Sequence, residues 1–402
     1  MESLQQPTPE AMVAELRERG ILTDPRLQAA FTAIPRHQFI PGTDLSDVYS
    51  PDKSIAVCYD MRGESTCSAT MPTMIANLLS CLELEAGQNV LEIGTGTGYT
   101  AAIIKNMIGS EGRVTSLEIE RDIVRMAQDN LQRAYVIDVN LVHVDGAEGY
   151  APRAAYDRIV STVGIWDIPP AWLRQLKPNG IIVAPIALDG LQVTGAFRLQ
   201  SDGTLLCTSV MPSAFVYIRG SATPPTMRKR IGSTALTLIS DEVDKIDSAS
   251  MHLLLSSDHE QSILSRGLDK QEYWYGFLPF MMMTEPPKSV FALYHVLDEQ
   301  KAYGLEGEGF ALFTPASACF VPYYGIGSVH YFAGADALLD IETQLQKWYD
   351  ADCPGIDRLR LRLIPKTHGA PEITEGKVFE RRTHYLHAWL EGTNIDKHES
   401  HA

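Results

Sequence analysis

The 402-residue sequence lacks the features that suit a nucleic-acid or membrane partner. Its 34 Lys and Arg residues are outnumbered by 50 Asp and Glu residues, which gives a formal net charge of −16. Because binding to phosphate backbones requires a basic surface, this charge argues against a nucleic-acid partner. No apolar run approaches the roughly 20 residues that span a bilayer, and no basic start followed by an apolar core indicates a signal peptide. We therefore expect a cytoplasmic protein without a membrane partner.

Metal-binding patterns are also absent. The six cysteines are scattered, without a C-x-x-C pair or a cluster of Cys and His residues, so the sequence predicts no metal site. Scattered thiols of this kind are typical of reduced cytosolic proteins. The cysteines are Cys58, Cys67, Cys81, Cys207, Cys319 and Cys353.

What the sequence does contain is a glycine-rich turn between two regular segments. Residues 90–93, which are apolar except for Glu92, predict a buried strand, and residues 99–108 predict a helix with apolar residues on one face. Between them lie Gly94, Gly96 and Gly98. Because glycine has no Cβ, it permits positive φ and lets a ligand approach the backbone closely. Amide groups exposed at such a helix N-terminus suit an anionic group of a ligand.

The spacing of these glycines differs from that of two common phosphate loops. The dinucleotide fingerprint is G-x-G-x-x-G, and the P-loop requires a following Gly-Lys-Ser/Thr. This sequence has G-x-G-x-G, preceded by the acidic Glu92. The turn therefore predicts an S-adenosyl-L-methionine site, and the alternative is a turn that only packs a helix on a strand. The cofactor contacts expected in this stretch are Glu92, Gly94, Thr95, Gly96, Gly98 and Tyr99.

Two acidic residues end the next two predicted strands. Glu118 lies roughly 20 residues past the turn, where doubly wound folds keep an acid for ribose hydroxyls. Asp145 is followed by Gly146; an acid there can accept from the adenine amino group while the adjacent backbone meets the ring edge. The alternative for Glu118 is a solvated charge at a strand end. The further cofactor contacts that we expect are Glu118, Ile119, Asp145 and Gly146, which would lie at one crevice at the edge of a parallel sheet.

A run of small polar residues precedes a helix predicted over residues 72–84. Pro72 suits the first turn of that helix, and Ser68 and Thr70 lie in the run before it. Taken alone, the two hydroxyl groups are explained as helix caps.

Eight segments stand in a characteristic order along the chain. They are Ile34-Pro-Arg-His-Gln-Phe-Ile-Pro41, Tyr59-Asp60, the hydroxyl turn of residues 65–72, the glycine turn, Glu118, Asp145-Gly146, Tyr156-Asp157 and residues 169–180. In combination, these segments resemble the protein-L-isoaspartate O-methyltransferases over roughly residues 16–220. The resemblance implies an α/β fold with a doubly wound, Rossmann-like, seven-stranded sheet. It also implies S-adenosyl-L-methionine as methyl donor, S-adenosyl-L-homocysteine as product and a carboxylate as acceptor.

The same resemblance implies where methyl transfer takes place. In this family a serine two residues before the proline of the hydroxyl turn sits at the transfer site. The corresponding residue is Thr70, with Ser68 as the fallback, and Cys67 and Ser68 join the expected cofactor contacts. Two departures concern the choice of acceptor. Thr70 adds a methyl group to the family's serine, and Tyr217 replaces the proline of the family's closing strand, here residues 215–218.

The chain length predicts two domains. We expect residues 1–220 to form the methyltransferase domain and residues 221–402 to form a C-terminal α+β accessory domain for peptide recognition. In the second half, residues 358–364 alternate leucine with arginine, which predicts a strand whose arginine side is either solvated or binds an acidic peptide.

A two-domain chain of this kind resembles the O-methyltransferases that modify ribosomally made peptides such as lanthipeptides, graspetides and lasso peptides. That resemblance implies methylation of an ordinary aspartate, followed by closure to a succinimide (aspartimide). Its alternative is repair of L-isoaspartyl residues in proteins. A cofactor-binding regulator and a nicotinamide dehydrogenase are further alternatives, and the glycine spacing disfavours the dehydrogenase. The expected partner is a peptide or protein that carries Asp or isoAsp.

Overall fold

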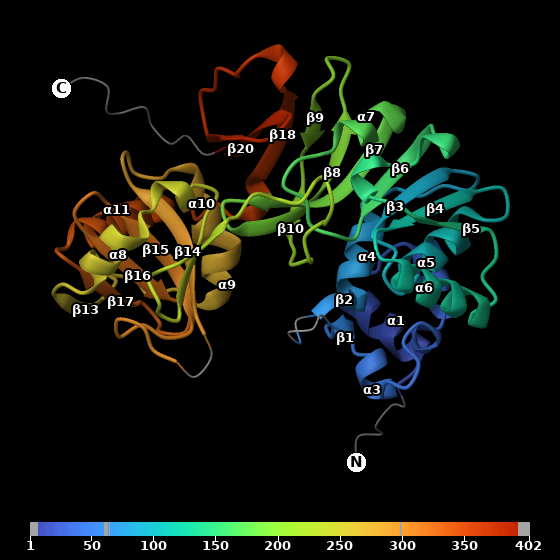
Figure 1. The fold of residues 1–402 in the computed structure, drawn as a ribbon, viewed down its shortest axis with the longest axis horizontal. Helices are drawn as coiled ribbons and strands as arrows, with labels where there is room; N and C mark the ends of the chain where they lie inside the picture. The colour runs from blue at the N-terminus through green and yellow to red at the C-terminus, as the bar shows by residue number, and fades with distance from the viewer. Residues whose placement is uncertain (1–6, 60–62, 64, 298–299, 393–402) are drawn as a thin grey trace. The chain divides into compact units, whose positions relative to one another are not determined.

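The computed structural model describes residues 7–59, 63, 65–297 and 300–392 (Figure 1). The chain divides into two compact units. The first unit comprises Met1–Ile186, Thr194–Cys207 and Ser213–Thr223, and the second comprises Ala187–Val193, Thr208–Pro212 and Pro224–Ala402. None of the helices in the described ranges combines the length and the apolar character needed to cross a membrane.

Short helices open the first unit, and their starts follow from the local sequence. The Thr8 side chain accepts from the first turn of α1 (Pro9–Glu18), and Asp24 does the same for α2 (Pro25–Ala33). Both helices place proline at the first position, where its missing N–H costs nothing. The next elements are η1 (Arg36–Gln38), α3 (Leu45–Val48), the antiparallel pair β1 (Ile55–Tyr59) and β2 (Ser65–Ala69), and α4 (Pro72–Ser80).

A twisted parallel sheet forms the centre of the first unit (Figure 1). Its parallel strands are arranged in the order β5-β4-β3-β6-β7. The strand order reverses beside β3, and in doubly wound sheets ligands bind outside the carboxyl ends of the strands at such a switch point. These strands are β3 (Asn89–Ile93), β4 (Arg113–Glu118), β5 (Val139–His143), β6 (Tyr156–Ser161) and β7 (Leu176–Leu188), followed by the antiparallel β8 (Leu191–Leu199) and β9 (Leu205–Cys207).

Helices follow the parallel strands, as the alternating sequence pattern predicts. The helix α5 (Tyr99–Ile108) is buried along most of its length, and α6 (Arg121–Arg133) buries one face through Ile123, Ala127 and Leu131. The remaining helical elements of this part are η2 (Gly146–Glu148), η3 (Ala151–Arg153) and α7 (Pro170–Gln175). The doubly wound α/β prediction is confirmed.

The second unit is rich in antiparallel strands, and it also carries helices, as the α+β prediction required. One sheet has the strand order β11-β12-β14-β15-β16-β17-β13. A second antiparallel group, β19-β20-β18, contains the arginine strand β18 (Leu359–Pro365). Along β18 the leucines are buried, and Arg360 and Arg362 are half-buried. Arg358, expected at the start of this strand, lies instead in η6 (Ile356–Arg358).

The other strands of the second unit are β10 (Val210–Pro212), β11 (Arg228–Arg230), β12 (Leu236–Ile239), β13 (His259–Ile263), β14 (Val290–Val296), β15 (Glu308–Phe313), β16 (Ala318–Pro322), β17 (Ser328–Phe332), β19 (Lys377–Glu380) and β20 (His384–Leu390). Its helical elements are η4 (Val243–Lys245), α8 (Ser248–Leu255), α9 (Lys270–Glu272), η5 (Tyr273–Phe277), α10 (Leu278–Met283), α11 (Asp336–Asp350), η6 and η7 (Lys366–His368).

Candidate active site

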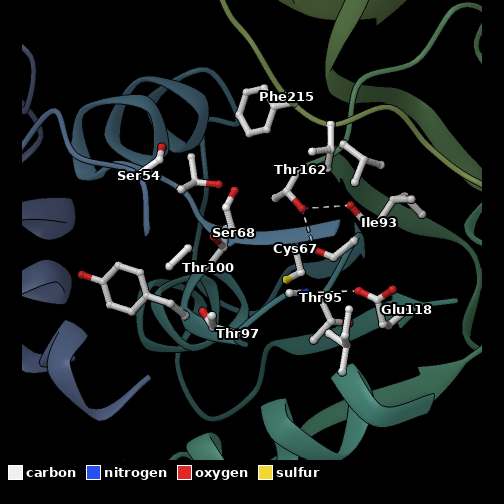
Figure 2. A pocket seen from close by; sticks show the side chains of 18 of the residues that line it. Ser54, Cys67, Ser68, Ile93, Thr95, Thr97, Thr100, Glu118, Thr162 and Phe215 are labelled. Carbon is white, nitrogen blue, oxygen red and sulfur yellow. Dashed lines mark hydrogen bonds between the residues drawn. The ribbon is translucent and has the colours of Figure 1, made fainter. Parts of the chain in front are cut away.

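The glycine-rich turn of residues 94–98, called the glycine loop below, follows β3 and is fixed to the neighbouring strand β4. The amides of Gly94 and Thr95 both donate to the Leu117 carbonyl, at 2.9 and 3.1 Å. Gly94 has a φ of +91°, and a Cβ there would lie 2.8 Å from Oγ1 of Thr162. The Thr162 hydroxyl donates to the Gly94 carbonyl at 2.5 Å (Figure 2). Glycine is therefore required at this position by both conformation and packing.

Gly96 differs from Gly94 because the space beside it is open. Its φ is +52°, and the nearest atom that a Cβ would meet is the Cys67 Sγ, 3.8 Å away. Figure 2 shows the Cys67 side chain pointing from β2 toward this loop. Burial raises the pKa of the Cys67 thiol to about 12, so the sulfur stays protonated and is a poor nucleophile. The backbone at Gly96 thus forms a cradle that a ligand can approach closely.

Glu118 lies at the end of β4, directly beside the loop. Its carboxylate accepts from the amides of Ile119 at 2.9 Å, Glu120 at 3.2 Å and Gly96 at 3.3 Å. The residue is 8% exposed, so it is not the solvated strand-end charge that the sequence left open. A carboxylate accepts from two ribose hydroxyls at once, which is the contact that the sequence predicts for it.

Glu92 lies underneath the loop. It is fully buried, it accepts from the Ser116 hydroxyl at 2.5 Å, and that hydroxyl lies 2.6 Å from the Thr95 hydroxyl. Burial raises the pKa of Glu92 to about 8. The residue does not line the cavity, because a side chain inside a buried strand points into the sheet's faces rather than past its end. The expected direct cofactor contact from Glu92 is therefore replaced by support of the loop from below.

Asp145 also departs from the expected arrangement. Its carboxylate accepts from the amides of Ala147 at 3.0 Å and Ser221 at 2.7 Å. Burial opposes the ionisation of Asp145, but these hydrogen bonds outweigh it and lower the pKa. Asp145 is not among the residues that line the cavity, whereas the adjacent Gly146 is. In the structure the Asp145 carboxylate holds the chain at Ser221, and its predicted contact with the adenine amino group stays a prediction.

The hydroxyl turn, whose first residues form β2, lines the same cavity as the glycine loop. Cys67, Ser68 and Thr70 all line it. The helix that follows, α4, has Met71 as its N-cap and no side-chain capping hydrogen bond. Neither Ser68 nor Thr70 is therefore a cap of α4, which removes the structural explanation that the sequence left open for their hydroxyl groups.

Arg36 was assigned no role from the sequence, but its side chain contacts the hydroxyl turn. Its guanidinium donates to the carbonyls of Ala69 at 3.0 Å and Thr70 at 2.9 Å. The residue is 1% exposed and also lines the cavity. The Arg-His pair of the segment at residues 34–41 is the only sequence signal that could have indicated it.

Residues 214–219 form the remaining wall of the cavity. The expected closing strand over 215–218 is wrong as a regular strand, because in the described part of the chain the segment forms a single parallel bridge, between Gly164 and Tyr217. The Gly164 amide donates to the Val216 carbonyl and the Ile218 amide donates to the Gly164 carbonyl, both at 2.8 Å. Tyr217, which stands at the family's proline position, lines the cavity. Asp60, of the Tyr59-Asp60 pair, lies outside the described residues.

One cavity of ≈ 220 Å³ therefore brings together most of the predicted site (Figure 2). The predicted residues that line it are Cys67, Ser68, Thr70, Gly94, Thr95, Gly96, Tyr99, Glu118, Ile119 and Gly146; Glu92, Gly98 and Asp145 do not. The open backbone at Gly96 and the buried carboxylate of Glu118 fit a nucleoside whose ribose lies at the switch point of the sheet. Within the described ranges, no group of His, Cys, Asp and Glu residues is arranged to hold a metal ion.

The doubly wound sheet with this loop, acid and cavity defines the first unit as a Rossmann-like methyltransferase fold. A family model described as Protein-L-isoaspartate(D-aspartate) O-methyltransferase matches residues 7–222, more than half of the chain. The chain belongs to this family. It is therefore an S-adenosyl-L-methionine-dependent carboxyl O-methyltransferase.

Individual relatives agree with this assignment over the first half of the chain. The protein-L-isoaspartate O-methyltransferase of Methanococcoides burtonii is 37% identical over 209 residues, which cover 52% of this chain and 98% of that protein. The Methanopyrus kandleri protein of the same name is 34% identical over 197 residues, or 49% of this chain and 84% of that protein. A solved structure titled protein-L-isoaspartate O-methyltransferase has a TM-score of 0.51 at 22% identity, covering 96% of this chain and all of that one; it supports the fold alone.

Proposed function

We propose that this enzyme methylates the free carboxylate of L-isoaspartyl residues in proteins or peptides. The observation that carries the proposal is the shared cavity, which residues of the hydroxyl turn, the glycine loop and Glu118 all line. The family match and the names of the relatives support isoaspartate as the acceptor over the ordinary aspartate that the two-domain resemblance implied.

The chemistry requires positioning rather than a strong base. A carboxylate acceptor is already ionised near pH 7, because model carboxyl groups have pKa values of about 4. Consistent with this, the described residues that line the cavity include no histidine and no lysine. Bound S-adenosyl-L-methionine supplies an electrophilic methyl group on a sulfonium. Orientation of the two reactants contributes on the order of 7–11 kcal/mol in favourable cases.

The residues of this chain take distinct roles in that positioning. Glu118 accepts from the ribose hydroxyls, and the backbone at Gly94 to Gly96 lies against the amino-acid portion of the cofactor. Thr70 holds one oxygen of the acceptor carboxylate, with Ser68 as the fallback, so that the other oxygen faces the methyl group. Methylation turns the carboxylate into an ester, whose carbonyl carbon is a better electrophile. The next backbone amide nitrogen can then attack this carbon, form the C–N bond of a succinimide and release methanol, which takes up the amide proton.

A second candidate acceptor is an ordinary aspartate in a ribosomally made peptide. Two observations in the cavity favour it: Thr70 stands in place of the family's serine, and Tyr217 forms part of the wall. A third is the presence of the second unit, because the family model ends at residue 222. In either case we propose that residues 221–402 recognise the peptide. Arg360 and Arg362 are half-buried on the side of β18 opposite its leucines, and Arg360 already pairs with Glu391 at 2.7 Å, so this side of the strand is not reserved for an acidic peptide.

The test uses two peptides that differ only in having L-isoaspartate or aspartate at one position. Methylation is followed as the mass of one added methyl group and as S-adenosyl-L-homocysteine release. The proposal predicts kcat/KM at least about tenfold higher for the isoaspartyl peptide, a difference of about 1.4 kcal/mol in transition-state stabilisation. Methylation of the aspartyl peptide alone, followed by loss of methanol, contradicts it and supports the second candidate.

A further inference from the structure

Arg36 is a fully buried guanidinium whose partners are backbone carbonyl groups. Its Nη1 donates to the Val48 carbonyl at 2.5 Å, and its Nη2 donates to the carbonyls of Ala69 at 3.0 Å and Thr70 at 2.9 Å. Within the part of the chain that the structure describes, Arg36 forms no ion pair with a carboxylate. Buried charges are normally paired, so a cation held only by carbonyl groups requires an explanation.

Burial lowers the pKa of Arg36 to about 10, which leaves the side chain cationic at neutral pH. The guanidinium group of arginine is planar and charged, and its N–H groups can hold several acceptors in one fixed geometry. The single ammonium group of a lysine cannot do this. Here the guanidinium group connects the end of α3 at Val48 to two consecutive peptide groups at the hydroxyl turn. These links span 12, 33 and 34 residues of chain.

Strand pairing holds the first part of the hydroxyl turn, since Ala69 of β2 lies opposite Ile55 of β1, and the chain beyond Ala69 is held by other contacts. It leaves β2 after Ala69 and enters α4 without a capping side chain, and one further contact is the Met71 amide, which donates to the Ser54 hydroxyl at 3.2 Å. The direction of the Thr70 hydroxyl follows from the orientation of the peptide groups on either side of it. Both of those carbonyl groups accept from Arg36.

We propose that Arg36 is a positioning residue for methyl transfer, which holds the turn so that the hydroxyl group of Thr70 faces the acceptor carboxylate. This inference rests on the proposed function, since it assigns Thr70 to the transfer site. It predicts that Arg36 affects turnover more than it affects cofactor binding, because within the described residues Arg36 donates to the carbonyl groups of the hydroxyl turn and not to Glu118 or the glycine loop.

Arg158 provides a matched control in the same unit. It too donates to backbone carbonyl groups, from Nε to Leu82 at 2.5 Å and from Nη2 to Glu83 at 3.1 Å. It is not among the residues that line the cavity. Replacing either arginine with lysine keeps the positive charge and removes the guanidinium group. Both variants therefore lose hydrogen bonds to backbone carbonyl groups, and both should lose folding stability for that reason.

The experiment compares Arg36→Lys with Arg158→Lys by melting temperature, by the Kd for S-adenosyl-L-homocysteine and by kcat on the peptide that the wild type methylates. Both variants are expected to have a lower melting temperature than the wild type. Only Arg36→Lys is expected to lose at least about tenfold in kcat, with Kd changed less than about twofold. A Thr70→Val background should abolish most of the additional effect of Arg36→Lys, because both changes act on the same hydroxyl.

Equal kcat values for the two variants would overturn the proposal, and so would a loss in kcat that is matched by a loss of cofactor affinity. Arg36→Gln serves as a second variant. If both Arg36 variants are unfolded while Arg158→Lys is folded, the residue supports folding alone and the proposal is wrong. A wild type that ignores the isoaspartyl peptide but methylates the aspartyl one counts against the proposed function and leaves this comparison intact.

Discussion

The backbone amide of Gly96 lies 3.3 Å from Oε2 of Glu118, 22 residues further along the chain. This contact joins the glycine loop after β3 to the acid at the end of β4. It arises because neighbouring parallel strands bring their carboxyl ends to one edge of the sheet. The contact holds the Glu118 carboxylate beside the glycine loop, where its oxygens can accept further hydrogen bonds from a ligand.

Removing the carboxylate of Glu118 should weaken cofactor binding. We expect Glu118→Gln to raise the Kd for S-adenosyl-L-homocysteine by about tenfold or more, because hydrogen bonds to a charged group contribute about 1.5–3 kcal/mol. Isothermal titration calorimetry measures this directly. Asp122→Asn is the control, since that nearby acid is exposed, does not line the cavity and pairs with Arg125 at 3.3 Å. Similar losses in both variants would contradict the assignment of Glu118.

A methyl group on the glycine loop should obstruct the cofactor. Gly96→Ala adds a Cβ that meets only the Cys67 sulfur, at 3.8 Å, so the protein itself has room for it. Gly87→Ala is the control, because Gly87 also has a positive φ, +81°, and its Cβ would meet nothing within 4 Å. Both changes should cost about 1–2 kcal/mol of folding stability, but only Gly96→Ala should raise the cofactor Kd. Unchanged affinity in Gly96→Ala would place the cofactor elsewhere.

Glu92 makes the stability of the enzyme depend on pH. Its pKa rises from an ordinary value of 4.5 to about 8 on folding because the residue is buried. A raised carboxyl pKa contributes stability below the unfolded value, and that contribution is lost as the pH rises toward 8. At 1.36 kcal/mol per pKa unit the loss reaches at most about 5 kcal/mol.

Glu92→Gln should therefore be compared with the wild type in urea between pH 5 and pH 9. Glutamine stays neutral, so the free energy of unfolding of the variant should gain on that of the wild type as the pH rises, and level off above about pH 8. A difference that is the same at every pH would show that Glu92 titrates normally.

The hydroxyl turn should control turnover rather than cofactor binding. Thr70→Val keeps the shape of the side chain and removes the hydroxyl, so we expect kcat to fall at least about tenfold while the Kd for S-adenosyl-L-homocysteine changes little. Ser68→Ala is the parallel variant. If Ser68→Ala loses turnover and Thr70→Val does not, the fallback residue carries the role.

Much of this site could be predicted from the sequence because its signals are local. The glycine spacing, the strand that follows and the acid at its end fix Gly94, Gly96 and Glu118 at the edge of the sheet. The direction in which a side chain points from a strand is harder to predict from the sequence. Glu92 precedes the loop by two residues, yet it points beneath the loop toward Ser116.

The residues that could not be predicted depend on contacts between distant segments. Asp145 accepts from the amide of Ser221, 76 residues away, and this partner is invisible in the local sequence. Arg36 contacts carbonyl groups, which every residue carries, so no pattern of side chains identifies its partners at Val48, Ala69 and Thr70. The segment at residues 215–218 formed one bridge instead of a strand for the same reason, since its pairing depends on Gly164.

The central claim is that one cavity, between the glycine loop and the hydroxyl turn, carries methyl transfer. A crystal structure of the enzyme with S-adenosyl-L-homocysteine tests it most directly. We predict that the ribose hydroxyls lie within hydrogen-bonding distance of Glu118 and that the sulfur faces Thr70 and Ser68. Cofactor bound away from Gly96 and Glu118, or with its sulfur turned from the hydroxyl turn, would contradict the account.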